Sequence, residues 1–410
     1  MQKTLVVGGG GAAGFFCAVT AARRNPDLKV LLVEKSGKLL SKIKVSGGGR
    51  CNVTHSCFSI TEMAGKYPRG SNFVKKTFHQ FFTTDTIQWF EERGIPIKTE
   101  EDGRMFPVTN SSQSIIDCLL GEAEKYGVEI RLHHEIKKIN YLEGVPAFDI
   151  EFANGLQMNA DFICLASGGY PKSSMFEWIR NTGHTIEEPV PSLFTFNMPE
   201  NPITSLMGIS IPSATVKITG TNLKESGPLL ITHWGMSGPA ILKLSAWGAR
   251  ILNEKNYRFE IRINWLGNLT EQLLREEIQS LRENSGKKKI RQKNPWELPQ
   301  RFWEYLLDQC GINDIHWADL PSVLQNKLIQ QLTGQVFAVD GKTTFKEEFV
   351  TAGGIRLSEV NHNTMESRIR PGLYFAGEIV DVDGVTGGFN FQHAWTSGYI
   401  AGKSIAEIIS

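Results

Sequence analysis

The sequence predicts an α/β fold in which one domain is interrupted by an inserted domain. Three observations support this prediction. The chain opens with a short β-rich run, a glycine turn and a helix of small residues. Near residue 190 the pattern changes to short alternating strands, and after about residue 345 the pattern of the opening returns. The expected parts are a first segment of the interrupted domain at 1–190, an insert at 191–344 and a second segment at 345–410.

The first elements are expected to form a β-α-β unit. Residues 4–7 are β-rich and apolar, residues 11–24 are small and apolar as far as a stop at Pro26, and residues 28–33 are almost wholly apolar. Apolar residues without alternation suit a parallel strand that is covered on both faces. The unit therefore predicts a parallel sheet that begins at residue 4.

Turn residues mark the later elements of the first segment. Residues 36–70 are rich in Gly, Ser, Lys and Asn and are expected to form a long loop. The elements expected after it are a helix at 78–93 ending at Gly94, a hairpin at Asp102-Gly103, a helix at 112–126 closed by Gly127, a hairpin at Asn154-Gly155, and a buried strand at 162–165 that leads into Ala166, Ser167, Gly168 and Gly169.

The insert is expected to combine β and α structure. Short strands such as 215–219 and 258–263 come first, and the polar segment 270–333 reads as helical. Its expected packing residues are Trp296, Phe302, Trp303 and Leu306. The second segment of the interrupted domain then supplies a strand at 373–376 and a helix of small residues at 389–409.

The glycine turn satisfies the pattern G-x-G-x-x-G at Gly9, Gly11 and Gly14, with Ala12 and Ala13 between the last two. The first glycine permits a tight turn, the second lets a pyrophosphate approach the backbone, and the third lets helix and strand pack closely. The N-terminus of the helix then offers unpaired N–H groups to the phosphates.

Glu34 ends the second expected strand, 20 residues after Gly14. This is the position of an acid that accepts hydrogen bonds from ribose hydroxyls. Because all parts occur in register, the segment predicts a dinucleotide site, although the turn does not distinguish FAD from NAD.

A second glycine motif follows at residues 46–52, and with it the chain resembles a known family. This family is the BaiN-like bacterial flavoproteins, also called the aminoacetone-oxidase-type FAD-binding family, distant relatives of the glutathione-reductase-type flavoproteins. The resemblance runs essentially end to end. Its markers are GGGAAG, VSGGGRCNVTH, GRMFPVT, LLITHWGMSGPAIL, VTAGGI and GLYFAGEIVDVDGVTGGFNFQHAWTSGYIAGKSI. The chain departs from the family after Gly169, where Tyr170-Pro171-Lys172 runs directly into Ser173.

The resemblance implies a discontinuous Rossmann-like FAD-binding domain interrupted by an inserted β-barrel with an α-helical subdomain at about 270–333. It implies FAD as the cofactor. The cofactor contacts that it implies are Gly9, Gly11, Ala12, Ala13, Gly14, Glu34, Lys35, Ser46, Gly47, Gly48, Gly49, Arg50, Cys51, Asn52, Ile136, Ala166, Gly168, Gly377, Glu378, Asp381, Gly387, Gly388, Phe389 and Asn390.

Residues 377–390 have two features that suit a flavin site. Strand ends of such sheets face the ligand crevice, so an acid after Gly377-Glu378, either Asp381 or Asp383, is placed to bond ribityl hydroxyls. The segment 387–390 opens the last helix. Its N-terminal dipole would favour the negative charge of a reduced flavin.

The general acid or base is not assigned by the sequence. His55, His233 and His393 are candidate acid–base groups, and His233 with Trp234 is the candidate pair to face the flavin. No metal-ligand spacing surrounds the three histidines, so no metal site is expected. The cysteines are scattered, and five residues separate Cys51 from Cys57 where a glutathione-reductase-type redox pair has four. The chain has no second G-x-G-x-x-G motif, so NAD(P)H is expected to dock only transiently.

The expected partner is a small-molecule substrate, and the charge balance points to no other class of partner. Lys and Arg number 44 against 43 Asp and Glu, which gives no reason to expect a nucleic-acid or membrane partner. The one basic cluster is Lys287, Lys288, Lys289, Arg291 and Lys293. The start does not read as a signal peptide and no apolar run is long enough to span a membrane, so a cytoplasmic location is expected. The oligomeric state is left open.

The expected function is an FAD-dependent oxidoreductase. Hydride would come from NAD(P)H or an organic substrate and pass to an oxo or enone-type acceptor or to oxygen. Two alternatives stay open: a tRNA-modifying flavoprotein, and a non-enzymatic flavin-binding sensor or partner-binding protein.

Overall fold

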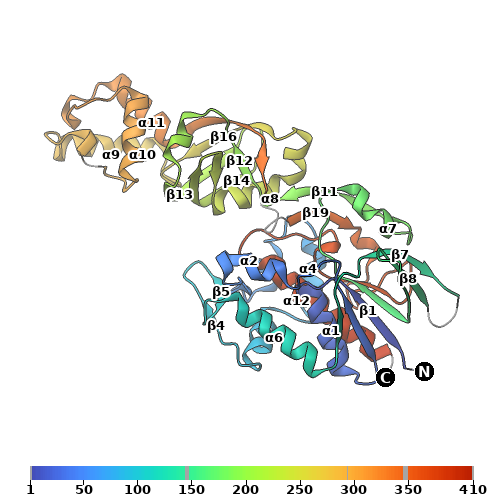
Figure 1. The fold of residues 1–410 in the computed structure, drawn as a ribbon. Helices are drawn as coiled ribbons and strands as arrows, with labels where there is room; N and C mark the ends of the chain where they lie inside the picture. Colours follow the sequence, from blue (N-terminus) through green and yellow to red (C-terminus); the bar gives the residue numbers. More distant parts are fainter. Residues whose placement is uncertain (1, 144–146, 293, 345–349, 409–410) are drawn as a thin grey trace. The chain divides into compact units, whose positions relative to one another are not determined.

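A computed structural model describes residues 2–143, 147–292, 294–344 and 350–408, and its contacts divide the chain into two units (Figure 1). The first unit comprises the described residues of 1–192 and 345–410, and the second comprises 193–344. The N-terminal and C-terminal segments therefore belong to one folded unit, and the second unit is a continuous piece of chain.

A parallel five-stranded sheet forms the centre of the first unit, as the apolar strands predict. All four neighbouring pairs in it are parallel. Its strands, in spatial order, are β20 (Leu373–Phe375), β10 (Phe162–Leu165), β1 (Thr4–Gly8), β2 (Lys29–Val33) and β6 (Glu129–Arg131).

Two helices from opposite ends of the chain lie against each other beside this sheet (Figure 1). They are α1 (Ala12–Arg24) and α12 (Phe389–Ile408). A Cβ at Gly398 would lie 2.4 Å from the carbonyl oxygen of Ala13, and a Cβ at Gly402 would lie 2.4 Å from that of Cys17. Glycine is therefore required for α12 to approach α1 this closely.

Smaller elements surround the sheet. Three antiparallel groups are β3 (Thr54–His55) with β5 (Arg104–Pro107) and β4 (Ile97–Thr99); β7 (Ile136–Tyr141) with β8 (Phe148–Phe152) and β9 (Gln157–Ala160); and β11 (Ile186–Ser192) with β19 (Val350–Ile355). The helices are α2 (Ser41–Gly49), α3 (Ile60–Ala64), α4 (Ser71–Thr77), α5 (Thr83–Glu91), α6 (Ser112–Lys125) and α7 (Glu177–Arg180). Short 3₁₀ turns cover Ser173–Phe176, Leu357–Glu359 and Gly377–Ile379.

Two sequence expectations for this unit are wrong. The segment 36–70 contains α2 and α3 and is not one long loop. The helix expected at 78–93 begins later, because residues 78–82 form a turn after α4 and α5 covers only Thr83–Glu91. The backbone N–H of Phe82 donates to the Asp85 carboxylate at 2.7 Å, which starts the new helix. Buried aromatic residues in the turn before α5 continue the apolar pattern, so the sequence did not reveal where the helix begins.

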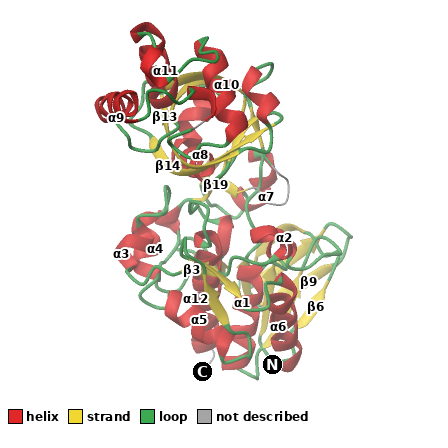
Figure 2. Ribbon diagram, turned by 90° about the vertical axis from the view of Figure 1, so that its left-hand side faces the viewer, coloured by secondary structure: helices red, strands yellow, loops and turns green. Residues whose placement is uncertain are grey.

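The second unit contains a seven-stranded antiparallel sheet with helices packed around it (Figure 2). The strands, in spatial order, are β17 (Gln335–Asp340), β16 (Arg258–Asn264), β13 (Ser210–Ile218), β14 (Lys224–Thr232), β15 (Gly235–Ser237), β12 (Thr195–Asn197) and β18 (Lys342–Thr343). The helices are α8 (Pro239–Glu254), α9 (Glu271–Asn284), α10 (Gln300–Cys310) and α11 (Ser322–Gly334), with 3₁₀ turns at Pro202–Leu206, Ile290–Gln292 and Trp317–Asp319.

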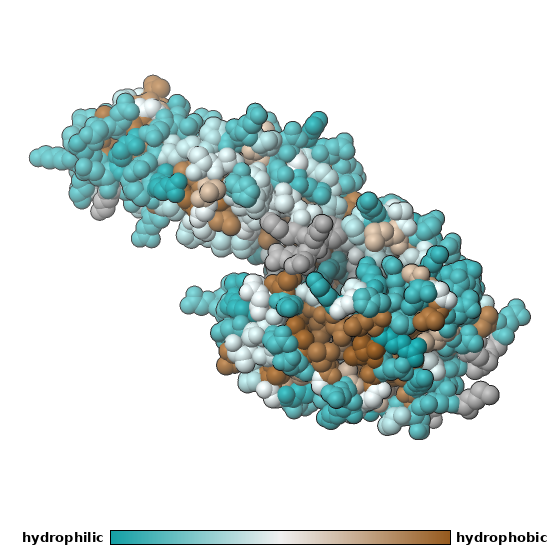
Figure 3. All heavy atoms as spheres, in the orientation of Figure 1, coloured by the Kyte–Doolittle hydropathy of each residue, from teal (hydrophilic) through white to brown (hydrophobic). Residues whose placement is uncertain are grey.

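The sheet of the second unit is rolled in the manner of a barrel. Strands β17 and β18 lie at its opposite edges, yet only Gly341 separates them in the chain. The two edges must therefore approach each other. Apolar side chains from strands and helices share one core, which includes the expected packing residues Phe302, Trp303 and Leu306, with Trp296 packed against it. Polar residues accordingly dominate the visible surface of this unit (Figure 3).

Among the described residues, no helix is both long enough and apolar enough to cross a membrane.

The glycine contacts between α1 and α12 give a stability prediction. Gly402→Ala should destabilise the protein by roughly 1–3 kcal/mol, because the added methyl group overlaps the backbone of α1. Gly121→Ala is the matched control. Gly121 lies exposed in α6, and outside its own helix no described heavy atom lies within 4 Å of the position that a Cβ would take, so a gain of roughly 0.4–1 kcal/mol is expected. Urea denaturation of both variants checks the pair, and equal effects would contradict the packing argument.

Candidate functional site

The three glycines of the first motif have the different environments that pyrophosphate binding requires. Gly9 has φ +126°, and a Cβ there would lie 2.3 Å from the carbonyl oxygen of Ala166. A Cβ at Gly14 would lie 1.9 Å from the carbonyl oxygen of Gly9. At Gly11, apart from its chain neighbours, no described heavy atom lies within 4 Å of the Cβ position. Gly9 and Gly14 therefore serve packing, whereas Gly11 leaves its backbone open to a ligand.

The N-terminus of α1 is chemically suited to phosphates. In the described residues no side chain caps it, and its first turn, which contains Ala12 and Ala13, has no acidic residue. Its unpaired N–H groups and partial positive charge remain available to an anion.

Glu34 is held at the end of β2. Its Oε2 accepts from the backbone N–H of Gly10 at 2.9 Å, and its Oε1 accepts from the N–H and the hydroxyl of Ser36, each at 2.9 Å. These bonds fix the orientation of the carboxylate beside the glycine turn. Each oxygen keeps further lone-pair capacity for a ribose hydroxyl.

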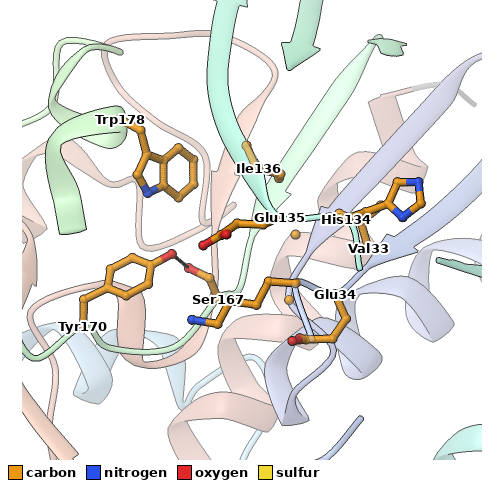
Figure 4. Close-up of a pocket in the computed structure, with 11 residues that line it drawn as sticks. Val33, Glu34, His134, Glu135, Ile136, Ser167, Tyr170 and Trp178 are labelled. Carbon is orange, nitrogen blue, oxygen red and sulfur yellow. Dashed lines mark hydrogen bonds between the residues drawn. The ribbon is translucent and has the colours of Figure 1, made fainter. Parts of the chain in front are cut away.

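A pocket lies beside Glu34, between the ends of β1, β2 and β10 and the start of β7 (Figure 4). Tyr170 and Trp178 lie on one side of it, and Glu34 and Val33 lie on the other (Figure 4). The Tyr170 hydroxyl donates to Ser167 Oγ at 3.1 Å. The described lining residues are Gly8, Gly9, Val33, Glu34, Lys35, His134, Glu135, Ile136, Ser167, Tyr170 and Trp178.

The pocket combines expected and unexpected residues. Glu34, Lys35 and Ile136 were expected there, and the Ile136 side chain lies so close to Gly8 that a Cβ at Gly8 would be 2.7 Å from Ile136 Cδ1. The sequence did not predict Tyr170 or Trp178 as lining residues. Both follow the departure from the family pattern at Gly169. The position of Tyr170 soon after the end of β10 could have indicated it, whereas Trp178 lies in α7 and had no such signal.

The second glycine motif forms a left-handed turn within α2. Gly47, Gly48 and Gly49 have φ of +58°, +70° and +84°, and Cys51 also has a positive φ of +62°. A Cβ at Gly47 would lie 2.7 Å from the Phe106 ring, whereas the Cβ position of Gly48 has no described heavy atom within 4 Å apart from its neighbours. Ser46 leaves the helical conformation and starts this turn.

Asn52 joins a segment of the N-terminal part of the chain to one of the C-terminal part. With its amide turned to satisfy both neighbours, Asn52 donates to the Thr54 carbonyl oxygen at 3.0 Å and accepts from the Gly388 N–H at 2.9 Å. His55 Nδ1 lies 3.0 Å from the Gly387 carbonyl oxygen, and its ring stacks on Phe389 with centroids 4.7 Å apart. The structure therefore brings the Ser46–Asn52 turn to the start of α12.

The turn before α12 is closed by Asn390. Its side chain accepts from the Gly384 N–H at 2.8 Å and donates to the Gly384 carbonyl oxygen at 2.9 Å. The Tyr67 hydroxyl donates a hydrogen bond to the Phe389 carbonyl oxygen at 2.5 Å. These bonds hold Gly387 and Gly388 in position.

Gly377 and Glu378 lie beside α1 at the end of β20. Gly377 has φ +73°, and a Cβ there would lie 2.8 Å from Ala13 Cβ. Glu378 Oε1 accepts from the Thr351 N–H at 2.8 Å, and Glu378 Oε2 pairs with Lys42 Nζ at 2.5 Å. Glu378 therefore joins β19, α2 and the strand end.

Of the two acids expected at the flavin, Asp383 turns inward. It is fully buried, forms a two-pronged ion pair with Arg69 and accepts from the Ser192 hydroxyl at 2.8 Å. Burial raises its pKa, while Arg69 and Ser192 act in the opposite direction. Because Asp383 is buried and paired, half-buried Asp381 is the more accessible of the two acids, and a contact of either with the ribityl hydroxyls stays a prediction.

Comparison with known proteins identifies the family. The family model described as "HI0933-like protein Rossmann domain" matches residues 2–404. The chain belongs to this family. It is 27% identical to a 3-dehydro-bile acid delta(4,6)-reductase of Clostridium scindens, across 96% of this chain and 97% of the relative. It is 28% identical to a ribosomal RNA dihydrouridine synthase of Haemophilus influenzae across 99% of both chains, and 29% identical to one of Escherichia coli across 96% and 95%.

Solved structures share the fold of this HI0933-like protein. An open flavocytochrome c3 fumarate reductase matches with a TM-score of 0.52 at 18% identity, across 99% of this chain and 78% of that one. A 3-ketosteroid-delta4-(5alpha)-dehydrogenase from Rhodococcus jostii matches with 0.51 at 13%, across 98% and 97%. The expected α/β class with a Rossmann-like sheet is confirmed. The family assignment makes the chain a flavin-dependent oxidoreductase, and so places it among enzymes rather than flavin sensors.

The remaining expected contacts lie in three places. Ala166 packs on Gly9, and Gly168 has φ +76° at the same strand end. Arg50 lies over the Phe106 ring at 4.0 Å and pairs with Glu100 at 2.5 Å, so its guanidinium faces β5. His233 and Trp234 belong to the second unit, where Trp234 Nε1 donates to Thr195 Oγ1 at 2.9 Å and the two rings meet edge to face. Their expected position at the flavin stays a prediction.

The described residues contain no group of three or more His, Cys, Asp or Glu side chains placed to hold a metal ion. In the basic cluster, Lys289 pairs with Asp314 and Arg291 with Asp308, whereas Lys287 and Lys288 are exposed. Lys293 lies outside the described residues.

Burial keeps one histidine and two cysteines near the glycine segments uncharged. Burial lowers the pKa of His393 to about 4, so the ring, whose Nε2 lies 3.2 Å from the Gly377 carbonyl oxygen, is neutral at pH 7. Burial raises the pKa of the Cys51 thiol to about 12 and also raises that of Cys57. Both cysteines are unpaired. A thiolate at either position is therefore disfavoured at neutral pH.

Glu34→Ala should lower FAD affinity at least tenfold, because hydrogen bonds to a carboxylate contribute roughly 1.5–3 kcal/mol each. Ser36→Ala is the control. It removes one bond to Glu34 but keeps the carboxylate, so only a small loss is expected. Equilibrium titration of the apoprotein with FAD measures both, and unchanged affinity in Glu34→Ala would show that the ribose lies elsewhere.

Cys51→Ala and Cys57→Ser should both retain flavin reduction and reoxidation, singly and together. The reason is that neither thiol is poised to form a thiolate. Repeated anaerobic reduction followed by readmission of oxygen tests this. Loss of cycling in both single variants, with FAD still bound, would restore a dithiol mechanism.

Proposed function

We propose that this protein is an FAD-dependent reductase that takes hydride from NAD(P)H and delivers it to a carbon–carbon double bond conjugated with a carbonyl group. The observation that carries the proposal is the contact of Asn52 with Gly388. It joins the two glycine segments, one from each end of the chain, that the family resemblance assigns to the flavin. FAD, when bound, would supply the two-electron chemistry.

The residues of the first unit fit FAD along its length. Glu34, Tyr170 and Trp178 suit the adenosine, since a carboxylate accepts ribose hydroxyls and aromatic rings pack on a base. The open backbone at Gly11 and the uncapped N-terminus of α1 suit the pyrophosphate. Gly48, Asp381 and the turn before α12 are the proposed contacts nearer the flavin ring.

The protein's own contribution is binding and orientation. Neutral His393 holds no proton to donate readily, and the Asp383 carboxylate is paired with Arg69. The start of α12 presents backbone N–H groups near Gly388, where a helix dipole stabilises negative charge. The general acid is not assigned among these residues of the first unit, and His233 and Trp234 stay the proposed candidates.

The acceptor class is supported by the names of the relatives. A bile acid delta(4,6)-reductase and a dihydrouridine synthase both add hydrogen to a double bond, and in both substrates, the 3-oxo-conjugated diene and the uracil ring, that bond is conjugated with a carbonyl group. A small enone is the first proposed acceptor, in line with the near-neutral charge of the chain.

A uridine in RNA is the second candidate acceptor. It is favoured by the two relatives named as ribosomal RNA dihydrouridine synthases, which match this chain over almost all of their length. The expectation that the protein has no nucleic-acid partner therefore stays a prediction. The same holds for the cytoplasmic location.

NADH or NADPH should bleach the bound flavin under anaerobic conditions, and a suitable acceptor should restore the oxidised spectrum repeatedly. Stopped-flow absorbance gives both rates. A conjugated steroid enone and a uridine-containing ribosomal RNA fragment are compared as acceptors, with saturated steroid and uridine-free RNA as controls. Failure of every reductant to bleach the flavin, or of every acceptor to reoxidise it, would refute the proposal.

A further inference from the structure

A groove in the first unit lies apart from the pocket beside Glu34. Its walls come from α4 with the preceding Gly70, and from the segment around the 3₁₀ turn Leu357–Glu359. Its volume is about 690 Å³, which is within the usual range of ligand sites. These walls are nearly 300 residues apart in sequence, so only the tertiary structure creates the groove.

Three basic side chains meet in this groove: Lys76 from one wall, and His362 and Arg368 from the other. Lys76 and Arg368 lie close enough to His362 to affect its protonation. Burial lowers the pKa of His362, and the positive charges of Lys76 and Arg368 lower it further. The His362 ring also meets Phe73 edge to face, with centroids 6.5 Å apart.

The described residues that line the groove do not neutralise its positive charge. Among the described residues that line it there is no carboxylate, and Lys76 and Arg368 form no ion pair with a described residue. The two nearest acids in sequence are engaged elsewhere. Glu359 accepts from the Thr185 N–H at 2.8 Å, and Glu366 accepts from the Gly372 N–H at 2.8 Å.

The groove is held in shape and has an apolar side. Gln80, which follows α4, donates to the carbonyl oxygens of His362 and Asn363 at 3.5 and 3.1 Å and so ties one wall to the other. Phe73, Leu357 and Val360 give it apolar surface. A ligand with negative charge and a flat apolar ring matches this combination.

The groove adjoins the segment proposed to contact the flavin. A Cβ at Gly70 would lie 2.6 Å from Val382 Cγ2 and 3.2 Å from the Asp381 carbonyl oxygen. The neighbouring Arg69 forms the buried ion pair with Asp383. The lining at Gly70 thus rests directly on residues 381–383.

We propose that this groove, lined by Lys76, His362 and Arg368, binds the phosphates of the reduced pyridine dinucleotide that supplies hydride. Lys76 and Arg368 match the two negative charges of its pyrophosphate, and the apolar wall would pack on a ring. The assignment rests on the proposed function for the identity of the ligand. It explains how a donor can dock without a second glycine motif of the Rossmann type.

The test is charge reversal, Lys76→Glu with Arg368→Glu, in the FAD-loaded protein. The concentration of NADPH or NADH that half-saturates flavin reduction should rise about tenfold or more at low salt. Reduction by N-benzyl dihydronicotinamide, which has the same ring but no phosphates, should be unchanged. The matched control, Lys287→Glu with Lys288→Glu, reverses two exposed charges in the second unit and should alter neither reductant. Equal losses with both reductants, or the same loss in the control, would overturn the assignment.

Direct titration separates this inference from the proposed function. If NAD(P)H fails to reduce the wild-type flavin, the proposed donor is wrong, and calorimetry with NADP+ then decides the groove alone. Binding that disappears on charge reversal supports a nucleotide site, whereas absence of binding in the wild type overturns it. A third titration uses single-stranded RNA. Weakened RNA binding in the reversed variant, with NADPH saturation unaltered, would show that the groove contacts RNA phosphates instead.

Discussion

The close contact between α1 and α12 is the constraint on which the first unit depends. Gly398 and Gly402 let α12 lie against the backbone of Ala13 and Cys17, where any Cβ would overlap a carbonyl oxygen. Since α1 starts at the N-terminal glycine turn and α12 ends the described chain, this contact brings together the first and last parts of the sequence. The insert can therefore interrupt the domain without separating its halves.

The parallel sheet places the candidate cofactor-binding residues along one of its edges. Gly9, Glu34, Ala166 and Gly377 each follow a strand of the same sheet, and carboxyl ends of parallel strands open onto one crevice. Each position contributes a different property. Gly9 and Gly377 adopt positive φ in crowded surroundings, Ala166 closes the space over Gly9, and Glu34 supplies a fixed carboxylate.

Charge is distributed unevenly over this unit. Close to the glycine segments, His393 is neutral, the cysteines are protonated and Asp383 is buried with Arg69, so protein groups there orient and bind. The groove along α4 is different, because none of its described lining residues is a carboxylate that could compensate the charges of Lys76 and Arg368. Such an arrangement suits an oxidoreductase in which the cofactor carries out the chemistry and the protein binds and orients the ligands and sets the electrostatics.

The sequence by itself determined the features that arise from local rules. The glycine spacing, Glu34 at the end of its strand, and the hairpins at Asp102-Gly103 and Asn154-Gly155 follow from backbone conformation and short-range pairing, and the structure has both hairpins where they were expected. The helix at Ser112–Lys125 is set by its cap at Ser111, which accepts from the Gln113 N–H.

Tertiary structure decided the rest, because those features depend on residues that are distant in sequence. The start of α5 at Thr83, and not at residue 78, is invisible to a pattern of apolar residues that stay buried through the preceding turn. Asp383 turns inward because Arg69 and Ser192 meet it there. Tyr170, which follows β10, and Trp178, which lies in α7, line the pocket beside Glu34 only because the fold brings these segments together. The groove at Lys76 and Arg368 exists for the same reason. Neither side chain forms a motif, and only the packing of two distant segments places their charges together.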